Sequence, residues 1–139
     1  MAKQWTTYDH PSDLGLSANA DSLGELFEAL GEGLAEQICP IRLVRSRRRR
    51  NIRVQAETPE ELLVEFLARL HRLFTLEKFL LSRVRVKRMD ERELQAELSG
   101  EAFDPGRHEL GPEIKAVTYH NLKVARAGER WVGQVLLDL

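Results

Sequence analysis

The first residues that could do chemistry form a short acidic segment containing Asp9, His10 and Asp13. Two carboxylates and an imidazole could bind a divalent cation and support a metal-dependent hydrolase. Aspartates in loops also commonly bond to the backbone of their own turn. The spacing alone favours that structural role, and the catalytic alternative stays open.

A second candidate is the end of the chain, where Asp138 precedes Leu139 and its terminal carboxylate. Together they offer oxygen donors, which hard cations such as Ca²⁺ and Mg²⁺ prefer. A solvated, frayed tail is the alternative. The apolar run up to Leu137 argues against fraying and predicts a terminus held in a sheet.

A third candidate lies in Glu113–Val124, which lacks glycine and proline and is rich in β-branched and aromatic residues. These features predict a strand. Alternation places Lys115, Tyr119 and Lys123 on one face, where a lysine could contact a phosphate or a partner's carboxylate. The opposite face is expected to meet the core and carries Ile114, Ala116, Thr118, His120, Leu122 and Val124.

The fourth candidate is the basic run Arg47, Arg48, Arg49 and Arg50, which could contact RNA phosphates. The net charge of −1 argues against binding nucleic acid through bulk charge. A solvated strand edge is the commoner role of such a run. Cys39 is the single cysteine, so an intrachain disulfide and a cysteine zinc cluster are excluded.

Hydrophobic periodicity and capping residues predict the elements that must position these groups. Ser22 and Thr58 begin two amphipathic helices, the first ending before Pro40. Strands are expected at 4–8, 14–20, 44–57, 80–89, 94–98, 113–124 and 131–138. The fold class is therefore α+β: a two-layer arrangement in which a largely antiparallel sheet packs with two main helices. The whole chain, 1–139, is expected to form one domain, and no apolar run suggests a membrane span or signal peptide, so the cytoplasm is the expected location.

Four segments carry a resemblance to a known family. They are Asp9-His-Pro-Ser-Asp-Leu-Gly15, then Gly100-Glu with Asp104 and Arg107-His108, then Glu113-Ile-Lys-Ala-Val-Thr-Tyr-His-Asn-Leu122, and the ending Leu137-Asp-Leu139. In this order and over nearly the whole chain, they resemble the archease family.

The resemblance implies a strand-helix-strand-strand core with an insertion, and a non-catalytic function. It implies an activator of an RtcB-type RNA ligase in tRNA splicing and RNA repair, which promotes guanylylation of the ligase and multiple turnover. It also implies a divalent-cation site, for calcium or for magnesium or manganese, on Asp13, Asp138 and the Leu139 carboxylate. Lys115 and His10 are the further functional residues expected there.

Two other functions stay open. The resemblance also implies a chaperone or modulator of a tRNA cytosine methyltransferase. The acidic segment with Asp9, His10 and Asp13 keeps a metal-dependent hydrolase as the third possibility. The chain departs from the family pattern at Pro11-Ser12 and at Phe66–His71, where a helix ligand is in doubt and Glu77 could replace it. The Arg47–Arg50 run is not part of the family pattern.

Overall fold

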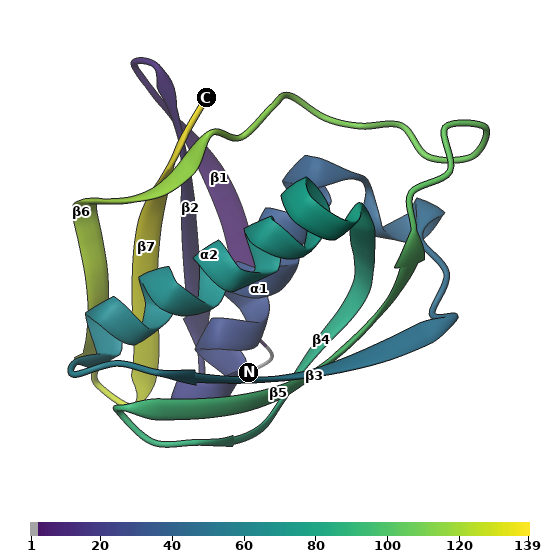
Figure 1. The fold of residues 1–139 in the computed structure, drawn as a ribbon. Coiled ribbons are helices and arrows are strands. Elements are labelled where there is room, and N and C mark those ends of the chain that lie inside the picture. The colour runs from purple at the N-terminus through teal and green to yellow at the C-terminus, as the bar shows by residue number, and fades with distance from the viewer. Residues whose placement is uncertain (1–2) are drawn as a thin grey trace.

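Two antiparallel sheets enclose two helices in the computed structural model, which describes residues 3–139 (Figure 1). The four-stranded sheet has the order β1 (Gln4–His10), β2 (Asp13–Ala20), β7 (Arg130–Asp138) and β6 (Ala116–Ala127). The three-stranded sheet has the order β3 (Arg48–Gln55), β5 (Glu93–Ala102) and β4 (Phe79–Met89). The α+β class is confirmed, and the strands, expected in one sheet, divide between two.

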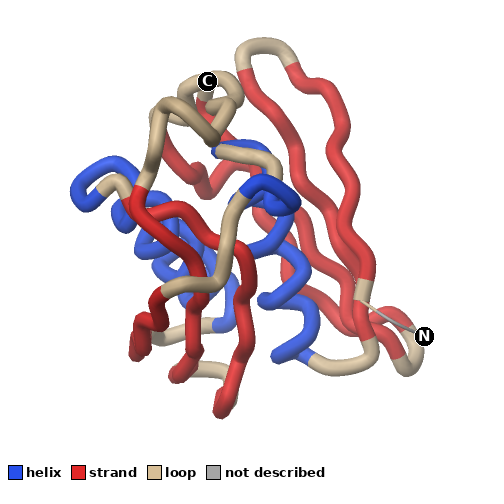
Figure 2. The backbone as a smooth tube through the Cα atoms, turned by 90° about the vertical axis from the view of Figure 1, so that its right-hand side faces the viewer, coloured by secondary structure: helices blue, strands red, loops and turns tan. Residues whose placement is uncertain are grey.

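The two helices, α1 (Leu23–Ile38) and α2 (Pro59–Glu77), each pack against strands of both sheets (Figure 2). Ser22 and Thr58 cap them as predicted, because each side-chain oxygen accepts a hydrogen bond from the backbone three residues on. The helices meet through Phe27 and Phe66, both fully buried. A short 3₁₀ helix, Ile41–Leu43, follows α1.

Alternation along β2 separates the two faces of the four-stranded sheet. Leu16 and its neighbour Val135 on β7 are fully buried and face the helices. Residues an odd number of positions away from Leu16 on β2 point to the opposite, outer face of the sheet. Asp13 is among them, so the fold presents its carboxylate on the outer face.

Strand β6 does not follow the alternation expected from its sequence. Thr118 pairs with Leu136, but the next pairing joins Lys123 to Gln134, so residues 119–122 interrupt the ladder. Asn121 has a φ of 55°, in the left-handed region. The expectation that Ala116 and His120 face the core was wrong: both are exposed, and Val117 packs on the core instead. The pairing of Ala116 with Asp138 sets this orientation.

Residues 103–115 connect the two sheets and are held at several points. The amide of Gly111 donates to the Ile38 carbonyl oxygen at 2.9 Å, and His71 Nε2 lies 2.7 Å from the Ile114 oxygen. Ile114 is buried. These contacts position the residues just before β6, including Lys115. Within residues 3–139, neither helix is long and apolar enough to cross a membrane.

Candidate functional site

A row of four residues crosses the end of the four-stranded sheet. His10 on β1 pairs with Asp13 on β2, Asp13 pairs with Asp138 on β7, and Asp138 pairs with Ala116 on β6. Residues directly opposite on neighbouring strands share a face. We call this row, with Lys115 and Leu139, the tip. Figure 1 shows the β1–β2 hairpin and the C-terminal end of β7 at the same end of the molecule.

A two-residue turn, Pro11-Ser12, positions His10 and Asp13. Ser12 has a φ of 65°, and proline before such a residue is typical of a type II turn. His10 Nδ1 lies 3.3 Å from Asp13 Oδ2, but the two do not form a hydrogen bond, and Nδ1 is buried without a hydrogen-bond partner. The imidazole nitrogen therefore faces the carboxylate with a hydrogen-bonding position unfilled.

Backbone contacts join the other predicted segments to this turn. The amide of Lys115 donates to the Asp138 carbonyl oxygen at 2.7 Å, and the amide of Leu139 lies 3.4 Å from the Ser12 oxygen. The side chain of Lys115 is exposed. The structure thus brings His10, Asp13, Lys115, Asp138 and Leu139 into one region, although they come from three separate parts of the sequence.

His120 lies next to the tip, although the sequence did not indicate it. Its ring lies edge-on to the ring of His10, with centroids 6.0 Å apart. The interruption of β6 at residues 119–122 brings it there. Its position in an alternating strand pattern had suggested the core, and a signal for an interrupted ladder is absent from the local sequence.

The donor chemistry of the tip fits a hard cation. Asp13 and Asp138 place two carboxylates opposite each other, and oxygen ligands suit Ca²⁺, Mg²⁺ and Mn²⁺. Within residues 3–139, no three histidine, cysteine, aspartate or glutamate side chains are arranged to hold a metal. A cation would therefore need main-chain or water oxygens as well, and the Leu139 carboxylate is the predicted donor of that kind.

Two other predicted ligands lie elsewhere. Asp9 pairs with Leu14, so alternation puts it on the opposite face of the sheet from Asp13. The acidic segment is therefore not one cluster. Glu77, the alternative ligand on α2, pairs with Arg50 through atoms 2.7 Å apart.

The arginine run is divided among different surroundings. Arg47 Nε lies 3.5 Å from Glu101 Oε1, while the Arg50 guanidinium lies over the Phe79 ring at 4.8 Å. Arg48 and Arg49 are exposed. The four side chains therefore do not form a single basic patch.

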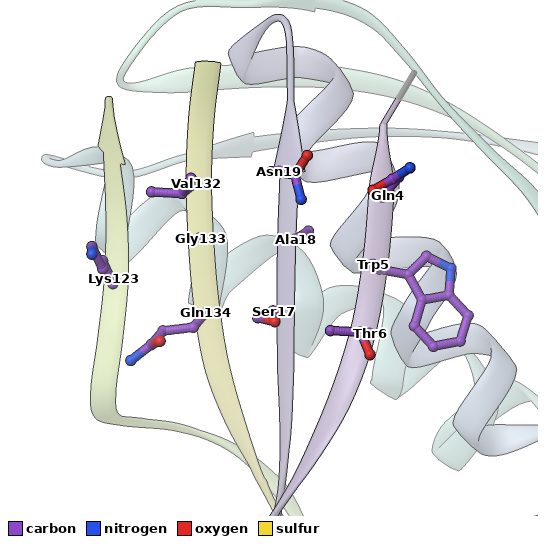
Figure 3. A pocket seen from close by; sticks show the side chains of 10 residues that line it. All are labelled: Gln4, Trp5, Thr6, Ser17, Ala18, Asn19, Lys123, Val132, Gly133 and Gln134. Carbon is purple, nitrogen blue, oxygen red and sulfur yellow. The ribbon is translucent and has the colours of Figure 1, made fainter. Parts of the chain in front are cut away.

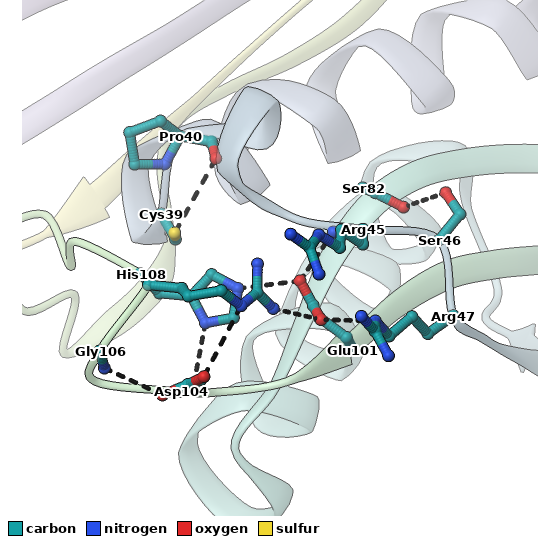
Figure 4. Close-up of polar contacts among 11 residues, drawn as sticks. Cys39, Pro40, Arg45, Ser46, Arg47, Ser82, Glu101, Asp104, Gly106 and His108 are labelled. Carbon is teal, nitrogen blue, oxygen red and sulfur yellow. Dashed lines mark hydrogen bonds and ion pairs between the residues drawn. The ribbon is translucent and has the colours of Figure 1, made fainter.

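Glu101 belongs to a segment that carries the family resemblance, but the sequence predicted no role for it; it is the centre of a buried polar cluster (Figure 4). Its carboxylate accepts hydrogen bonds from Arg107 Nη2 at 2.5 Å, from His108 Nε2 at 2.9 Å and from the Arg45 amide at 2.8 Å. The Asp104 amide donates to His108 Nδ1 at 2.8 Å, which leaves Nε2 to carry the ring proton. The cluster ties β5 to the connection that leads to the tip.

These hydrogen bonds, that of Arg107 foremost, lower the pKa of Glu101 to about 2. Cys39 lies beside this cluster in Figure 4, and burial raises the pKa of its thiol. A buried thiol with a raised pKa is a poor nucleophile. The cluster is therefore a structural anchor, and these surroundings do not activate the Cys39 thiol.

A shallow groove of about 320 Å³ lies on the outer face of the four-stranded sheet, farther along the strands from the tip (Figure 3). Its polar side chains include Thr6, Ser17, Asn19, Lys123 and Gln134. Apart from one lysine these are neutral amides and hydroxyls. The groove holds no acid–base pair, so it offers hydrogen bonds and no catalytic group.

The chain is similar to known proteins over nearly its whole length. The sequence model of the archease protein family (MTH1598/TM1083) matches residues 5–139. The archease of Pyrococcus furiosus is 34% identical over 141 residues, covering 99% of each chain. The archease of Methanopyrus kandleri is 30% identical and covers 97% of this chain and 99% of its own.

Solved structures agree with the fold. The solution structure of Methanobacterium thermoautotrophicum protein 1598 has a TM-score of 0.80 at 26% identity, covering 97% of this chain and 98% of its own. The Thermotoga maritima protein named "an archease, possible chaperone" has a TM-score of 0.67 at 21% identity, covering 96% of each chain, a likeness of fold alone. The chain therefore belongs to the archease protein family.

Proposed function

We propose that this protein is a non-catalytic activator of an RtcB-type RNA ligase in the cytoplasm, and that the tip is the part that acts on the ligase. The supporting observation is the row at the end of the sheet. It joins Asp13 and Asp138, with Lys115 bonded beside them, in a member of the archease family. The activity would be promotion of guanylate transfer from GTP onto the ligase, followed by repeated turnover.

The tip would hold a divalent cation through Asp13, Asp138 and the main-chain carboxylate of Leu139. When bound, a divalent cation supplies positive charge that attracts phosphate oxygens. The Lys115 ammonium, on an exposed side chain next to Asp138, supplies a second positive charge. Both charges sit at one end of the sheet, which suits insertion into a ligase site that handles GTP. His10 would orient Asp13 from the neighbouring strand.

The experiment is a guanylylation assay with a cognate ligase, radiolabelled GTP, Mn²⁺ and no RNA. The proposal expects faster labelling of the ligase in the presence of this protein. The variant Asp138→Asn should lose that effect while keeping the native circular dichroism spectrum. Asp9→Asn is the matched control, because it makes the same chemical change on the face of the sheet opposite to that of Asp138. It should activate normally. Equal activation by the Asp138 variant and the native protein would reject the tip.

A second candidate function is that of a chaperone or modulator of a tRNA cytosine methyltransferase. The observation that favours it is the name of the Thermotoga maritima relative in fold, "possible chaperone". A methyltransferase assay with and without this protein separates it from the ligase proposal. The metal-dependent hydrolase is less well supported, because Asp9 and Asp13 lie on opposite faces of the sheet.

A further inference from the structure

The two edge strands of the three-stranded sheet are strongly basic. Together β3 and β4 carry eight of the 21 lysine and arginine residues of the chain and no aspartate or glutamate. They flank β5 on either side. Positive charge is therefore concentrated on one sheet of a protein whose net charge is −1.

Pairing and burial identify the face on which these cations lie. Ile52 on β3 and Val84 on β4 are buried against the helices, so the residues that alternate with them point outward. Arg49 and Arg83 both pair with Ser99 of β5 and flank it. The first row across the outer face is thus arginine, serine, arginine.

A second basic row lies at Gln95, four residues before Ser99 on β5. Arg53 pairs with Gln95 from one side, and the register shift in β4 sets Lys87 and Arg88 near Gln95 from the other. Hollows of about 330 and 290 Å³ adjoin Gln95, one lined by Lys87 and Arg53 and the other by Arg88. The face is therefore hollowed beside its cations.

Most of these cations are available to a partner. Arg53 forms an ion pair with Glu93, with atoms 2.6 Å apart. In the part of the chain that the structure describes, the other five form no ion pair: Arg49, Arg83, Arg85, Lys87 and Arg88. The acidic residues on this face are Glu93 and Glu97 of the central strand, the latter paired with Arg85, and Asp90 in the β4–β5 turn, which lines the hollow beside Arg88.

We propose that this outer face, carrying Arg49, Arg53, Arg83, Arg85, Lys87 and Arg88, binds the phosphate backbone of an RNA strand. Outward side chains on one strand repeat about every 6.7 Å, and the two basic strands lie about 9.6 Å apart, so several phosphates can be met at once. Phe79, the one aromatic residue of the three strands, is buried. Without aromatic side chains on which bases could stack, binding is sequence-independent and strongly weakened by salt.

The choice of RNA over another polyanion rests on the proposed function. The existence of the basic face does not depend on that function, because it follows from the strand pairing and burial alone. The face also revises the role of the arginine run. Of Arg47 to Arg50, Arg49 points to this outer face, while Arg47 and Arg50 are engaged with Glu101 and Glu77. A purely protective role is the competing explanation, because arginines on edge strands discourage pairing with other chains.

The test is fluorescence anisotropy of a labelled 12-nucleotide single-stranded RNA, titrated with the native protein at 50 to 200 mM KCl. The variant Arg83→Gln/Arg88→Gln removes two cations that pair with neutral residues. It is expected to bind at least about tenfold more weakly at 50 mM and to reduce the slope of log K against log salt by about 1.4. Arg69→Gln/Arg72→Gln, on exposed positions of α2, makes the same charge change elsewhere and should bind as the native protein does.

Three outcomes overturn the proposal: no RNA binding by the native protein at 50 mM, equal losses in the two double variants, or unchanged RNA binding by Arg83→Gln/Arg88→Gln. In the third case, weaker binding of that variant to the ligase would assign the face to an acidic protein surface, and aggregation of the variant would support the protective role. The RNA-free guanylylation assay fails independently if the ligase proposal is wrong.

Discussion

Asp13 and Asp138 place two carboxylates opposite each other on neighbouring strands. Like charges at such positions destabilise a sheet. A positive group between them would remove that cost, and neither side chain forms an ion pair with a lysine or arginine among residues 3–139. At the residue scale, this repulsion is the physical reason to expect a cation at the tip.

The pair leads to a prediction about stability. In EDTA, Asp138→Asn should raise the free energy of unfolding by about 0.5 kcal/mol, because it removes the repulsion. Urea denaturation at pH 7 measures this. The same variant should fail to activate the ligase. A variant less stable in EDTA than the native protein would show that Asp138 is held by attractive contacts instead.

Glu101 leads to a prediction about pH. Its folded pKa of about 2 lies below its ordinary value of 4.5, so its contribution to stability is fully present above pH 4.5 and is lost as the pH falls toward 2. Glu101→Gln should lower the free energy of unfolding at pH 7 by about 2 kcal/mol, because Arg107 loses the closer of its two carboxylate partners.

The measurement is urea denaturation of the native protein and the Glu101 variant between pH 7 and pH 2.5. Subtracting the free energy of unfolding of the variant from that of the native protein separates the effect of Glu101 from that of the other carboxylates. It should be constant above pH 4.5 and shrink below it. A difference that does not change with pH would mean that Glu101 does not titrate as the structure indicates.

At the scale of elements, the β1–β2 turn decides which residues face each other at the tip. Ser12 occupies a left-handed conformation that β-branched residues adopt poorly. We predict that Ser12→Val lowers the free energy of unfolding by about 1 kcal/mol and weakens activation of the ligase. Ser12→Gly, which relieves the conformation, should activate normally. Chemical denaturation and the guanylylation assay check both variants.

Local signals in the sequence predict the helices and most strands well. Ser22, Thr58 and Pro59 mark the helix starts, and α1 and α2 begin where these residues require. The strands predicted at 80–89 and 94–98 pair as the hairpin β4–β5, and those predicted at 113–124 and 131–138 pair as the hairpin β6–β7. Helix starts and hairpins depend on residues that are close together in the chain, so a single sequence is enough to predict them.

Long-range features could not be read in the same way. Asp13 and Asp138 stand near opposite ends of the chain, and their pairing depends on the strand order β2–β7–β6. The family resemblance, and not their spacing, brought them together as a predicted set. The interruption of β6 and the Glu101 cluster depend on register and on Arg45 and His108, whose contacts no local pattern announces.

At the scale of the whole molecule, the charge is near zero in sum and uneven in distribution. Acidic groups meet at one end of the four-stranded sheet, and cations cover the outer face of the three-stranded sheet. The proposed functions therefore occupy separate surfaces. Losing one should leave the other intact.

Cation binding at the tip should stabilise the whole fold, because a ligand that binds only the folded protein shifts the unfolding equilibrium. Ca²⁺ or Mn²⁺ at 100 times its Kd should add about 2.7 kcal/mol to the free energy of unfolding, seen as a higher Tm. EDTA should reverse the shift. Asp13→Asn should abolish it, while Asp9→Asn should retain it. An identical shift in all three proteins would place the cation elsewhere.

The most direct test of the central claim is RNA ligation by a limiting amount of cognate RtcB-type ligase, with GTP and Mn²⁺, counted as product formed per ligase molecule. The account predicts that the ligase alone stops near one turnover and that the native protein raises the product to many per ligase. Asp138→Asn should restore the single-turnover limit. An unchanged yield with the native protein, or full activation by the Asp138 variant, would contradict it.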